Sequence, residues 1–379
     1  MNMVDLNNTD AHLYDLVARD LKKKIREYYF GQEGKIPNYL QLTEMYDVSM
    51  STIKKAMKIL NDEHVLVSRV GKGTFANKAF LEGSLNGHSI KKNGSERHKT
   101  GKVGLMIRDI DGPYFSGIYK ALADKADTLH QQLMLTVSRD FHQQEDSLLR
   151  MMMAHEVDGI LLTTRRKSIF GSRIYDLLYE QHIPTVLLHD VYDAKLPIVD
   201  VNNYLGGALA AEHLLKHVTG NLSVIVGEHG FRADDLRLEG FLDTLKQHDI
   251  DIENRCHVFR YSFGTENTAF DEGYKLGMSL AVKNLNIGGI FLFNDLIAMG
   301  FQKAMLERGI SIPQDIRVIG FDNIERCTEA RIPLTTIEVP RYEIGVKAYE
   351  ILRTFMRDGH SKVPPRTLLD PKLIIRDSA

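Results

Sequence analysis

The sequence predicts an α/β protein in two parts: a small N-terminal winged helix-turn-helix and a large two-lobed domain of doubly wound parallel sheets. Three observations lead to this fold class. Helical periodicity followed by a glycine-rich hairpin pattern occupies residues 11–78. Continuous apolar runs alternate with helical patterns over residues 102–376, as buried parallel strands do. The length of 379 residues also exceeds what one compact core supports.

Residues 11–78 are expected to form three helices and a hairpin. Apolar residues recur at helical spacing in HLYDLVARDLKKKIREYYF, and GQEGKIPN then breaks the chain. A short helix at 38–46, with Leu40 and Leu42 in the core, precedes a helix at 49–63. The following VLVSRVGKGTFANK predicts two short strands joined by a glycine turn.

The helix at 49–63 has two contrasting faces. On a helical wheel Ile53, Ala56, Met57 and Leu60 form a core stripe, and lysines lie opposite. A solvated amphipathic helix shows the same pattern. The preceding helix and turn, the hydroxyl residues at its start and the basic hairpin tip favour a DNA-recognition helix. The residues expected to contact DNA are Asn38, Tyr39, Ser49, Met50, Ser51, Thr52, Lys54, Lys55, Lys58, Lys72 and Gly73.

Met50 occupies the first turn of this helix, where side chains reach base edges. An arginine there could pair with guanine through two hydrogen bonds, whereas methionine has no donor. Its thioether could instead lie against a thymine methyl group. The alternative is that Met50 packs against the preceding helix and contacts no base.

A linker and a change of charge follow. Residues 79–101 are rich in Gly, Ser, Asn and Lys and predict a flexible linker. Residues 11–80 carry 12 Lys and Arg against 8 Asp and Glu, although the whole chain has a net charge of −2. A basic front on an acidic body suits a nucleic-acid-binding head fused to another domain.

The body is expected to have two lobes, about 102–201 with 339–367, and about 202–338 with 368–376. Its strand-like runs include KVGLMIRD, QQLMLTVSRD, DGILLTT, IPTVLLHD, LSVIVGEHG, GGIFLFND and IRVIGFDN. No apolar run reaches the roughly 18 residues that a membrane span needs, and MNMVDLNNTD is unlike a signal peptide. Cys256 and Cys327 are expected to be buried thiols of a cytoplasmic protein without metal, cofactor or membrane partner.

The head resembles the DNA-binding domain of the GntR family. The matching positions are Pro37, Leu42, Val48, Ser49, Thr52, Ala56, Leu60 and Gly71–Phe75. Met50 and Lys54 stand where that family has arginines, and Asn38-Tyr39-Leu40 replaces its Ser-Glu-Arg. The resemblance implies the winged-helix fold, while the carried-over DNA contacts are weakened at these three places.

The body resembles the effector domain of LacI/GalR repressors and type I periplasmic sugar-binding proteins. The matching blocks, in family order, are VGLMIRDIDGPYF, VDVNNYLGGALAAEHLL, DDLRLEGF, FLFNDLIAMGFQKAM, IRVIGFDN and PLTTIEVPRYEIG. A GntR-type head on such a body is similar to arabinose-repressor-type bacterial regulators. The resemblance implies operator DNA, a sugar effector and a homodimer as partners.

A polyol needs an aromatic plate and bidentate polar groups at strand ends that face a cleft. Tyr114 and Phe115 offer plates, although core packing explains them equally well. Arg237 suits paired hydroxyls or a helix surface, and Asn294 and Asp322 suit hydroxyls or helix caps. The expected effector-binding residues are Tyr114, Phe115, His189, Asp190, Arg237, Asn294 and Asp322. His189-Asp190 stands where sugar-binding relatives often have Asp-Arg or a lone Asp, which leaves that contact open.

Two further motifs have less specific meanings. TTRRK at 163–167 follows a strand and could hold a phosphate or carboxylate, although a charge run is usually a solvated loop. Gly206-Gly207 opens a helix, where close backbone approach rather than phosphate binding is expected.

The leading hypothesis is a sugar-responsive transcriptional regulator, acting as a repressor that a pentose, hexose or deoxyhexose releases from a pseudo-palindromic operator. A phosphorylated or acidic sugar effector, and an activator role, remain alternatives. A transport binding protein would need a signal peptide, and the winged head argues against it. An enzyme is not expected, because the sequence contains no nucleophile elbow, P-loop, dinucleotide fingerprint or metal cluster.

Overall fold

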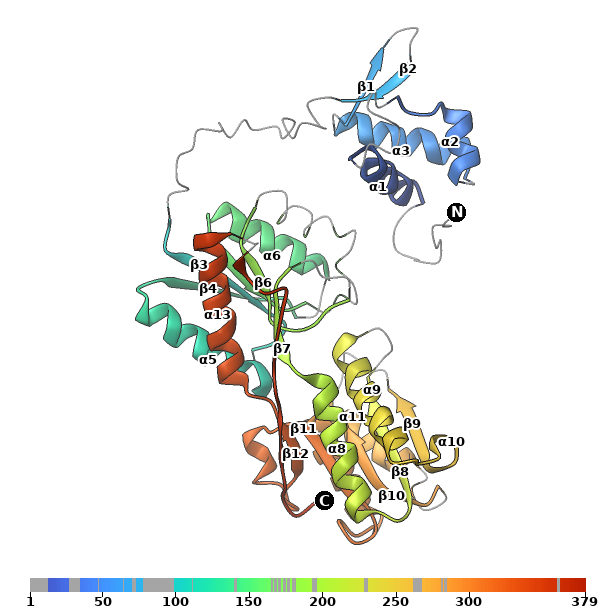
Figure 1. Cartoon of the computed structure of the whole chain (residues 1–379), viewed down its shortest axis with the longest axis vertical. Coiled ribbons are helices and arrows are strands. Elements are labelled where there is room, and N and C mark those ends of the chain that lie inside the picture. The colour runs from blue at the N-terminus through green and yellow to red at the C-terminus, as the bar shows by residue number, and fades with distance from the viewer. Residues whose placement is uncertain are drawn as a thin grey trace. The chain divides into compact units, whose positions relative to one another are not determined.

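The computed structural model describes residues 13–26, 35–46, 48–63, 65–69, 73–77, 99–110, 112–139, 142–164, 166, 169, 172, 175, 178, 182–192, 196–227, 231–261, 268–280, 282, 285–359 and 362–379. The chain divides into two compact units, Met1–His98 and Lys99–Ala379 (Figure 1). Of the expected linker, 79–98 lies outside the described residues. Thr100 and Gly101 belong to the second unit, because their backbone N–H groups donate to the Asp158 carboxylate at 2.9 and 2.8 Å.

The first unit contains the expected helices and hairpin (Figure 1). Its elements are α1 (Leu13–Arg26), α2 (Tyr39–Tyr46), α3 (Met50–Asp62), β1 (Leu66–Arg69) and β2 (Gly73–Ala76). The two strands pair antiparallel, with Val67 opposite Phe75, so the predicted winged helix-turn-helix is confirmed. Lys72, at the predicted hairpin tip, lies outside the described residues.

The core of the first unit forms where the helical wheel places it. Ile53, Ala56, Met57 and Leu60 of α3 are all buried. Leu42 is fully buried as expected, but Leu40 is 62% exposed, so its assignment to the core is wrong. Residues two apart on a helix point about 200° apart, so Leu40 and Leu42 cannot share the buried face of a short helix.

Lobe 1 of the second unit is built on a parallel six-stranded sheet in the order β13-β7-β6-β5-β3-β4. Its strands are β3 (Lys102–Ile107), β4 (Gln132–Val137), β5 (Gly159–Leu162), β6 (Thr185–Leu187), β7 (Ile198–Val201) and β13 (Arg366–Leu369). Its helices include α5 (Pro113–Thr128), α6 (His142–Ala154) and α13 (Arg341–Asp358). β5 and β7 are buried at every position, which explains their continuous apolar runs.

Lobe 2 repeats the design with the sheet order β14-β12-β11-β10-β8-β9, in which only β14 is antiparallel. Its strands are β8 (Asn221–Val226), β9 (Cys256–Arg260), β10 (Ile287–Leu292), β11 (Arg317–Asp322), β12 (Thr335–Glu338) and β14 (Lys372–Ile374). Its helices include α8 (Asn203–His217), α9 (Arg232–Gln247), α10 (Ile252–Arg255), α11 (Ala269–Ser279), α12 (Asp295–Glu307) and the 3-10 turn η1 (Glu325–Cys327). The doubly wound fold class is therefore confirmed.

Three described segments join the lobes, namely β7 to α8, β12 to α13 and β13 to β14 (Figure 1). The first two follow Val201 and Glu338, the last residues of β7 and β12. β13 runs to Leu369, so the third lies at 370–371 rather than at the expected division after residue 367. Lobe 2 also extends past the expected residue 376, since the Ser378 hydroxyl donates to the Val318 carbonyl at 2.6 Å.

Candidate functional site

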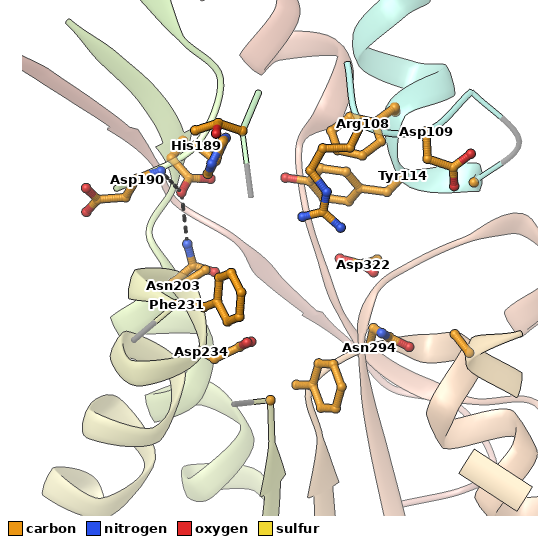
Figure 2. Close-up of a pocket in the computed structure, with 18 of the residues that line it drawn as sticks. Arg108, Asp109, Tyr114, His189, Asp190, Asn203, Phe231, Asp234, Asn294 and Asp322 are labelled. Atoms are coloured by element: carbon orange, nitrogen blue, oxygen red, sulfur yellow. Dashed lines mark hydrogen bonds between the residues drawn. The ribbon is translucent and has the colours of Figure 1, made fainter. Parts of the chain in front are cut away.

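A cavity of about 670 Å³ opens between the two lobes (Figure 2). It lies at the carboxyl ends of the parallel strands of both sheets, where an open α/β sheet binds its ligand. Every residue expected to contact the effector lines it: Tyr114, Phe115, His189, Asp190, Arg237, Asn294 and Asp322. The structure thus brings together side chains that are more than 200 positions apart in the chain.

Tyr114 and Phe115, which follow β3, differ in how much of each ring faces the cavity. Their rings meet edge to face, with centroids 5.0 Å apart and an interplanar angle of 89°. Phe115 is only 8% exposed and packs mostly into the core, while Tyr114 offers more of its surface to the cavity. Burial raises the pKa of the Tyr114 hydroxyl far above its ordinary value, and Asp200 and Asp322 add to the shift. Tyr114 therefore presents a neutral ring with a hydroxyl that can donate.

Arg237 of α9 is held rigidly at the floor of the cavity. Its Nε donates to Asn203 Oδ1 at 2.8 Å, and its Nη1 donates to the Phe293 carbonyl. The guanidinium carbon lies 3.6 Å from the centre of the Phe321 ring. Among the described residues Nη2 donates to no partner, so it can bind a ligand hydroxyl. Arg237 is a buried cleft residue rather than one on a helix surface.

Asn294 and Asp322 approach the cavity from the ends of adjacent strands in lobe 2 (Figure 2). Asn294 Oδ1 caps α12 by accepting from the Ile297 N–H at 2.9 Å, which leaves its amide group for a ligand. Asp322 has a backbone φ of 112°, a strained value for a non-glycine residue. Burial raises the pKa of its carboxyl, and Arg237 opposes that shift. A carboxyl held partly protonated can both donate to and accept from hydroxyls.

His189 and Asp190 follow β6, and they differ in charge and in how far other protein groups already bind them. Burial, helped by the charge of Arg108, lowers the pKa of His189 to about 3, so the ring is neutral. Asp190 Oδ1 accepts from Arg366 Nη2 at 2.8 Å, and its Oδ2 lies 3.8 Å from Arg232 Nε in lobe 2. Much of the Asp190 carboxylate is therefore engaged by arginines, with Oδ2 accepting no hydrogen bond among the described residues.

Asp200 is a cleft residue that the sequence analysis missed. Burial raises the pKa of its carboxyl to about 7, and the backbone N–H groups of Asp190 and Val201 oppose the shift. Those N–H groups donate to it at 2.8 and 2.7 Å, and Asn203 Nδ2 donates at 3.2 Å. Asp200 therefore organises the first inter-lobe connection, and it lay hidden inside an apolar strand.

Other lining residues were also missed. They include Arg108, Asp109, Arg139, Asn203, Phe231, Arg232 and Asp234. Arg108 stands at the carboxyl end of a buried strand, as Asn294 and Asp322 do, so the same signal could have found it. Of the TTRRK motif, Arg166 lines the cavity, but its Nε and Nη2 donate to Glu145 at 3.0 Å and Asp146 at 2.8 Å. Its guanidinium is thus engaged, and residues 165 and 167 lie outside the described residues.

Arg341 ties the two sides of the cavity together. It begins α13 immediately after the second connection. Its Nη1 donates to the Pro113 carbonyl at the start of α5, at 3.0 Å. Its Nη2 donates to the Asn323 carbonyl, next to Asp322, also at 3.0 Å. One guanidinium therefore links the helix that carries Tyr114 to the strand end that carries Asp322.

The candidate DNA-contacting residues of the first unit surround the start of α3. Ser49 caps this helix by accepting from the Thr52 N–H at 3.2 Å, and its hydroxyl lies 2.8 Å from the Ser51 hydroxyl. Met50 is 37% exposed, which argues against a purely core role. Lys54, Lys55 and Lys58 are exposed. The Lys55 ammonium also lies 5.2 Å from the centre of the Tyr14 ring and so contacts α1.

The start of α2 is also exposed. Asn38 Oδ1 accepts from the Gln41 N–H at 2.9 Å, and Gln41 Oε1 accepts from the Asn38 N–H at 3.0 Å. This reciprocal cap orders the first turn of the helix, and it engages the side-chain carbonyl oxygen of Asn38. Tyr39, the next residue, is 44% exposed, so its side chain is accessible to DNA. Gly73 has a φ of 107°, as a turn glycine requires.

The fold and the cavity together define a class: a winged helix-turn-helix joined to a two-lobed ligand-binding body, which is the organisation of a transcriptional regulator. The family of bacterial regulatory proteins, gntR family, matches residues 13–76, and the periplasmic binding protein-like domain matches residues 211–379. The chain therefore belongs to the transcriptional regulators that carry a gntR-family head and a LacI-type body.

Relatives support this membership. The ribose operon repressor of Halalkalibacterium halodurans is 30% identical over 314 residues, covering 80% of this chain and 89% of that protein. The arabinose metabolism transcriptional repressor of the same organism is 25% identical, covering 96% of each chain. The structure of a periplasmic binding protein/LacI transcriptional regulator from Alkaliphilus metalliredigens, complexed with D-xylulofuranose, has a TM-score of 0.60 and 26% identity. It covers 74% of this chain and 99% of its own.

None of the helices in the described residues has the length and apolar character needed to cross a membrane. No group of three or more His, Cys, Asp or Glu in these parts of the chain could hold a metal ion.

Proposed function

We propose that this regulator is a repressor that binds operator DNA through its winged helix-turn-helix and is released when a monosaccharide binds between the lobes. The observation that carries the proposal is the cavity itself. It combines an aromatic plate at Tyr114 with polar groups at Arg237, Asn294 and Asp322, which suits a ring of hydroxyls. The sugar named in the related Alkaliphilus complex supports the same ligand class.

Release would follow from lobe closure. The three connections let one lobe rotate against the other, which changes how the heads are presented to DNA. The coupling between effector and operator is expected to be about 1–3 kcal/mol and must be reciprocal. An activator would use the same coupling with a different operator position. Catalysis is not proposed, because the cavity residues are explained by binding.

A gel shift with the full chain tests the proposal, using its own promoter region and a panel of pentoses, hexoses and deoxyhexoses. At least one sugar should weaken the DNA complex, and the DNA should weaken binding of that sugar by the same factor. An operator complex that every sugar leaves unchanged, or a sugar affinity that operator DNA leaves unchanged, would contradict it.

The proposed operator-binding form is a homodimer. One winged head offers one recognition helix, whereas a two-fold dimer places two on a pseudo-palindrome. Sedimentation with and without operator DNA checks this, and a monomer at micromolar concentration in both would contradict it.

Arg341→Met should uncouple effector binding from DNA release. The methionine keeps an apolar stem but removes both hydrogen bonds that tie Pro113 to Asn323 across the lobes. The coupling free energy should fall by about 1–2 kcal/mol, measured as the ratio of operator affinities with and without sugar. Arg353→Met, exposed on the same helix, serves as the matched control and should leave the ratio unchanged. An unchanged ratio in Arg341→Met would show that this link has no role.

Met50 is proposed to face an A·T base pair in each half-site. Met50→Arg should shift the preference at that single position toward guanine by about 1–3 kcal/mol, because arginine can pair with guanine O6 and N7. Selection from a randomised operator library measures the shift. Lys54→Gln should instead weaken binding evenly across sequences and lower the salt dependence by about one ion. If Met50→Ala alters no preference at any position, Met50 does not read bases.

A further inference from the structure

A short chain of hydrogen bonds joins the first inter-lobe connection to Arg237. It begins at Asp200 in β7, which is 2% exposed and lines the cavity. Asp200 Oδ2 accepts from Asn203 Nδ2 at 3.2 Å (Figure 2). Asn203 Oδ1 in turn accepts from Arg237 Nε at 2.8 Å. One amide side chain at the start of α8 therefore connects a carboxylate of lobe 1 to an arginine of lobe 2.

The donor and acceptor chemistry of these groups permits one direction along the chain. A guanidinium can only donate, so Asn203 must turn its carbonyl oxygen toward Arg237 and its NH2 group toward Asp200. Asp200 also accepts from the backbone N–H groups of Asp190 at 2.8 Å and Val201 at 2.7 Å. Residue 200 thus faces three donors, and an ionised carboxylate offers acceptors to all of them.

Loss of an acceptor at position 200 would be transmitted to Arg237. A protonated carboxyl or an amide at this position would place a donor among the three donors that surround it. If the Asn203 amide turned round to relieve that contact, its NH2 group would face Arg237 Nε, which is also a donor. Arg237 would keep its Nη1 bond to the Phe293 carbonyl and its contact with the Phe321 ring. It would lose the bond that fixes the rotation of its guanidinium about those two contacts.

Asp200 lies among titratable and charged groups from several elements. Burial raises the pKa of its carboxyl to about 7, the two backbone N–H groups and the charge of Arg237 lower it, and the charge of Asp190 raises it. The carboxyl is therefore mostly ionised above about pH 7 and mostly protonated below it. The groups around Asp200, or paired with its neighbour Asp190, are Tyr114, Asp190, Arg232, Arg237 and Arg366.

We infer that Asp200 is a positioning residue of the effector site, which holds the Arg237 guanidinium in its ligand-binding orientation through Asn203. This inference rests on the proposed function and assigns an arginine of lobe 2 to the control of a carboxylate in lobe 1. The chain of hydrogen bonds spans the β7–α8 connection, so rotation of the lobes and orientation of Arg237 are coupled through it.

The Nε–H signal of Arg237 tests the chain of hydrogen bonds without an effector. In the full-length protein labelled with ¹⁵N-arginine, this NMR signal is assigned by its absence in Arg237→Lys. In the parent at pH 7.5 the Nε–H should exchange slowly with water, because Asn203 accepts from it. Asp200→Asn should speed the exchange by about tenfold at the same pH. Equal exchange rates in the two proteins would overturn the inference.

Sugar affinity is the second measurement. Calorimetry with D-ribose, L-arabinose and D-xylulose identifies the probe that the parent binds most tightly. Asp200→Asn should bind that probe about tenfold more weakly at pH 8. Glu239→Gln, which removes an exposed carboxylate on the helix that carries Arg237, is the control and should match the parent.

The pH profile separates positioning by an ionised carboxylate from a role in packing alone. Protonation of Asp200 competes with probe binding, so the affinity of the parent should fall by up to about tenfold from pH 8 to pH 6. The pKa of Asp322 is also raised, so that residue contributes to the profile in every variant that retains it. The part that belongs to Asp200 is the part absent from Asp200→Asn. Identical profiles in the parent and this variant would contradict the inference.

Exchanging the two side chains gives the sharpest outcome. In Asp200→Asn/Asn203→Asp, the amide at 200 can donate to the carboxylate at 203, which still accepts from Arg237. The double variant should therefore exchange the Nε–H more slowly and bind the probe more tightly than Asp200→Asn does. Additive losses would show that the two residues do not act through each other and would overturn the inference.

Direct contact between Asp200 and the sugar predicts a different result. Asp200→Asn would then lose probe affinity while the Arg237 Nε–H exchange stayed unchanged, and the inference would fail while the proposed function stood. If none of the three sugars binds the parent, the exchange rates of the parent, the single and the double variant still decide the inference. The proposed function is judged separately, by the operator gel shift with its wider panel of sugars.

Discussion

Replacing Asp322 with asparagine is expected to lower effector affinity by about 10–100-fold and to leave operator binding intact, so that the repressor stays on DNA when the effector is present. The strand β11 delivers this carboxyl into the cavity, where no described protein group donates to it. Asparagine keeps the shape and replaces one acceptor oxygen with a donor. Calorimetry and an operator gel shift with effector measure the two halves of the prediction.

Asparagine is a cleaner test than alanine at this position. Asp322 has a φ of 112° and Asn323 a φ of 53°, so the backbone is left-handed at both residues. Asparagine tolerates such conformations better than alanine, which would add backbone strain to the loss of the carboxyl. Asp322→Ala should lose the effector response at least as completely. Loss of operator binding in either variant would point to misfolding and contradict the assignment.

The pH dependence of stability provides an independent check on Asp322. Burial raises the pKa of its carboxyl above the ordinary value of 3.8, with Arg237 opposing the shift and Asp295 adding to it. As the pH rises above 3.8, the unfolded chain releases this proton before the folded protein does. The contribution of Asp322 to stability therefore falls steadily with rising pH and stops falling once the pH exceeds the folded pKa. Asp322→Asn lacks this effect. Its melting temperature relative to the parent should therefore rise between pH 5 and pH 8 in thermal unfolding scans.

Two of the cavity residues could be predicted because each stands at the end of a strand that is buried and apolar. Asn294 and Asp322 end such runs, and the carboxyl ends of parallel strands converge at one edge. Strands β9 and β13 were not predicted, because exposed residues recur at every second position in them and no continuous apolar run marks them. β14 was not predicted either, because it is only three residues long. These strands pair with β8, β7 and β12 in the folded sheets, and that pairing is not visible in the local sequence pattern.

The partners of the cavity residues could not be read from local sequence. Asp190 was expected to bind the effector, but Arg366, which lies 176 positions later, donates to it. Lys55, which was expected to contact DNA, also has its ammonium 5.2 Å from the centre of the Tyr14 ring of α1, a contact that the sequence did not indicate. Such pairings depend on tertiary packing, which periodicity does not encode.

The glycine pair at the start of α8 tests a prediction from the sequence. Close backbone approach was expected for both glycines. The structure confirms it for Gly207, whereas a Cβ on Gly206 would lie 2.6 Å from the Phe321 ring, a side chain, so the expectation is wrong for Gly206. A Cβ on Gly207 would lie 1.9 Å from the Arg237 carbonyl oxygen of α9. A Cβ on Gly240 of α9 would lie 1.9 Å from the Tyr204 carbonyl oxygen of α8. The two helices therefore cross through reciprocal glycine contacts with backbone, which cannot move aside as a side chain can.

Gly207→Ala is accordingly expected to lower the free energy of unfolding by about 3 kcal/mol or more, measured by denaturant titration. The direction of the change in the free energy of unfolding is what tests the contact, because at an unpacked helical position the same substitution raises stability by about 1 kcal/mol. Separating α8 from α9 also shifts Arg237, whose carbonyl forms the contact, so effector affinity should fall in the folded fraction. Lys216→Ala, exposed on the same helix, should leave both quantities near their parent values. A Gly207→Ala protein as stable as its parent would mean that the helices do not cross at this distance, and Arg237 would then need another source for its fixed position.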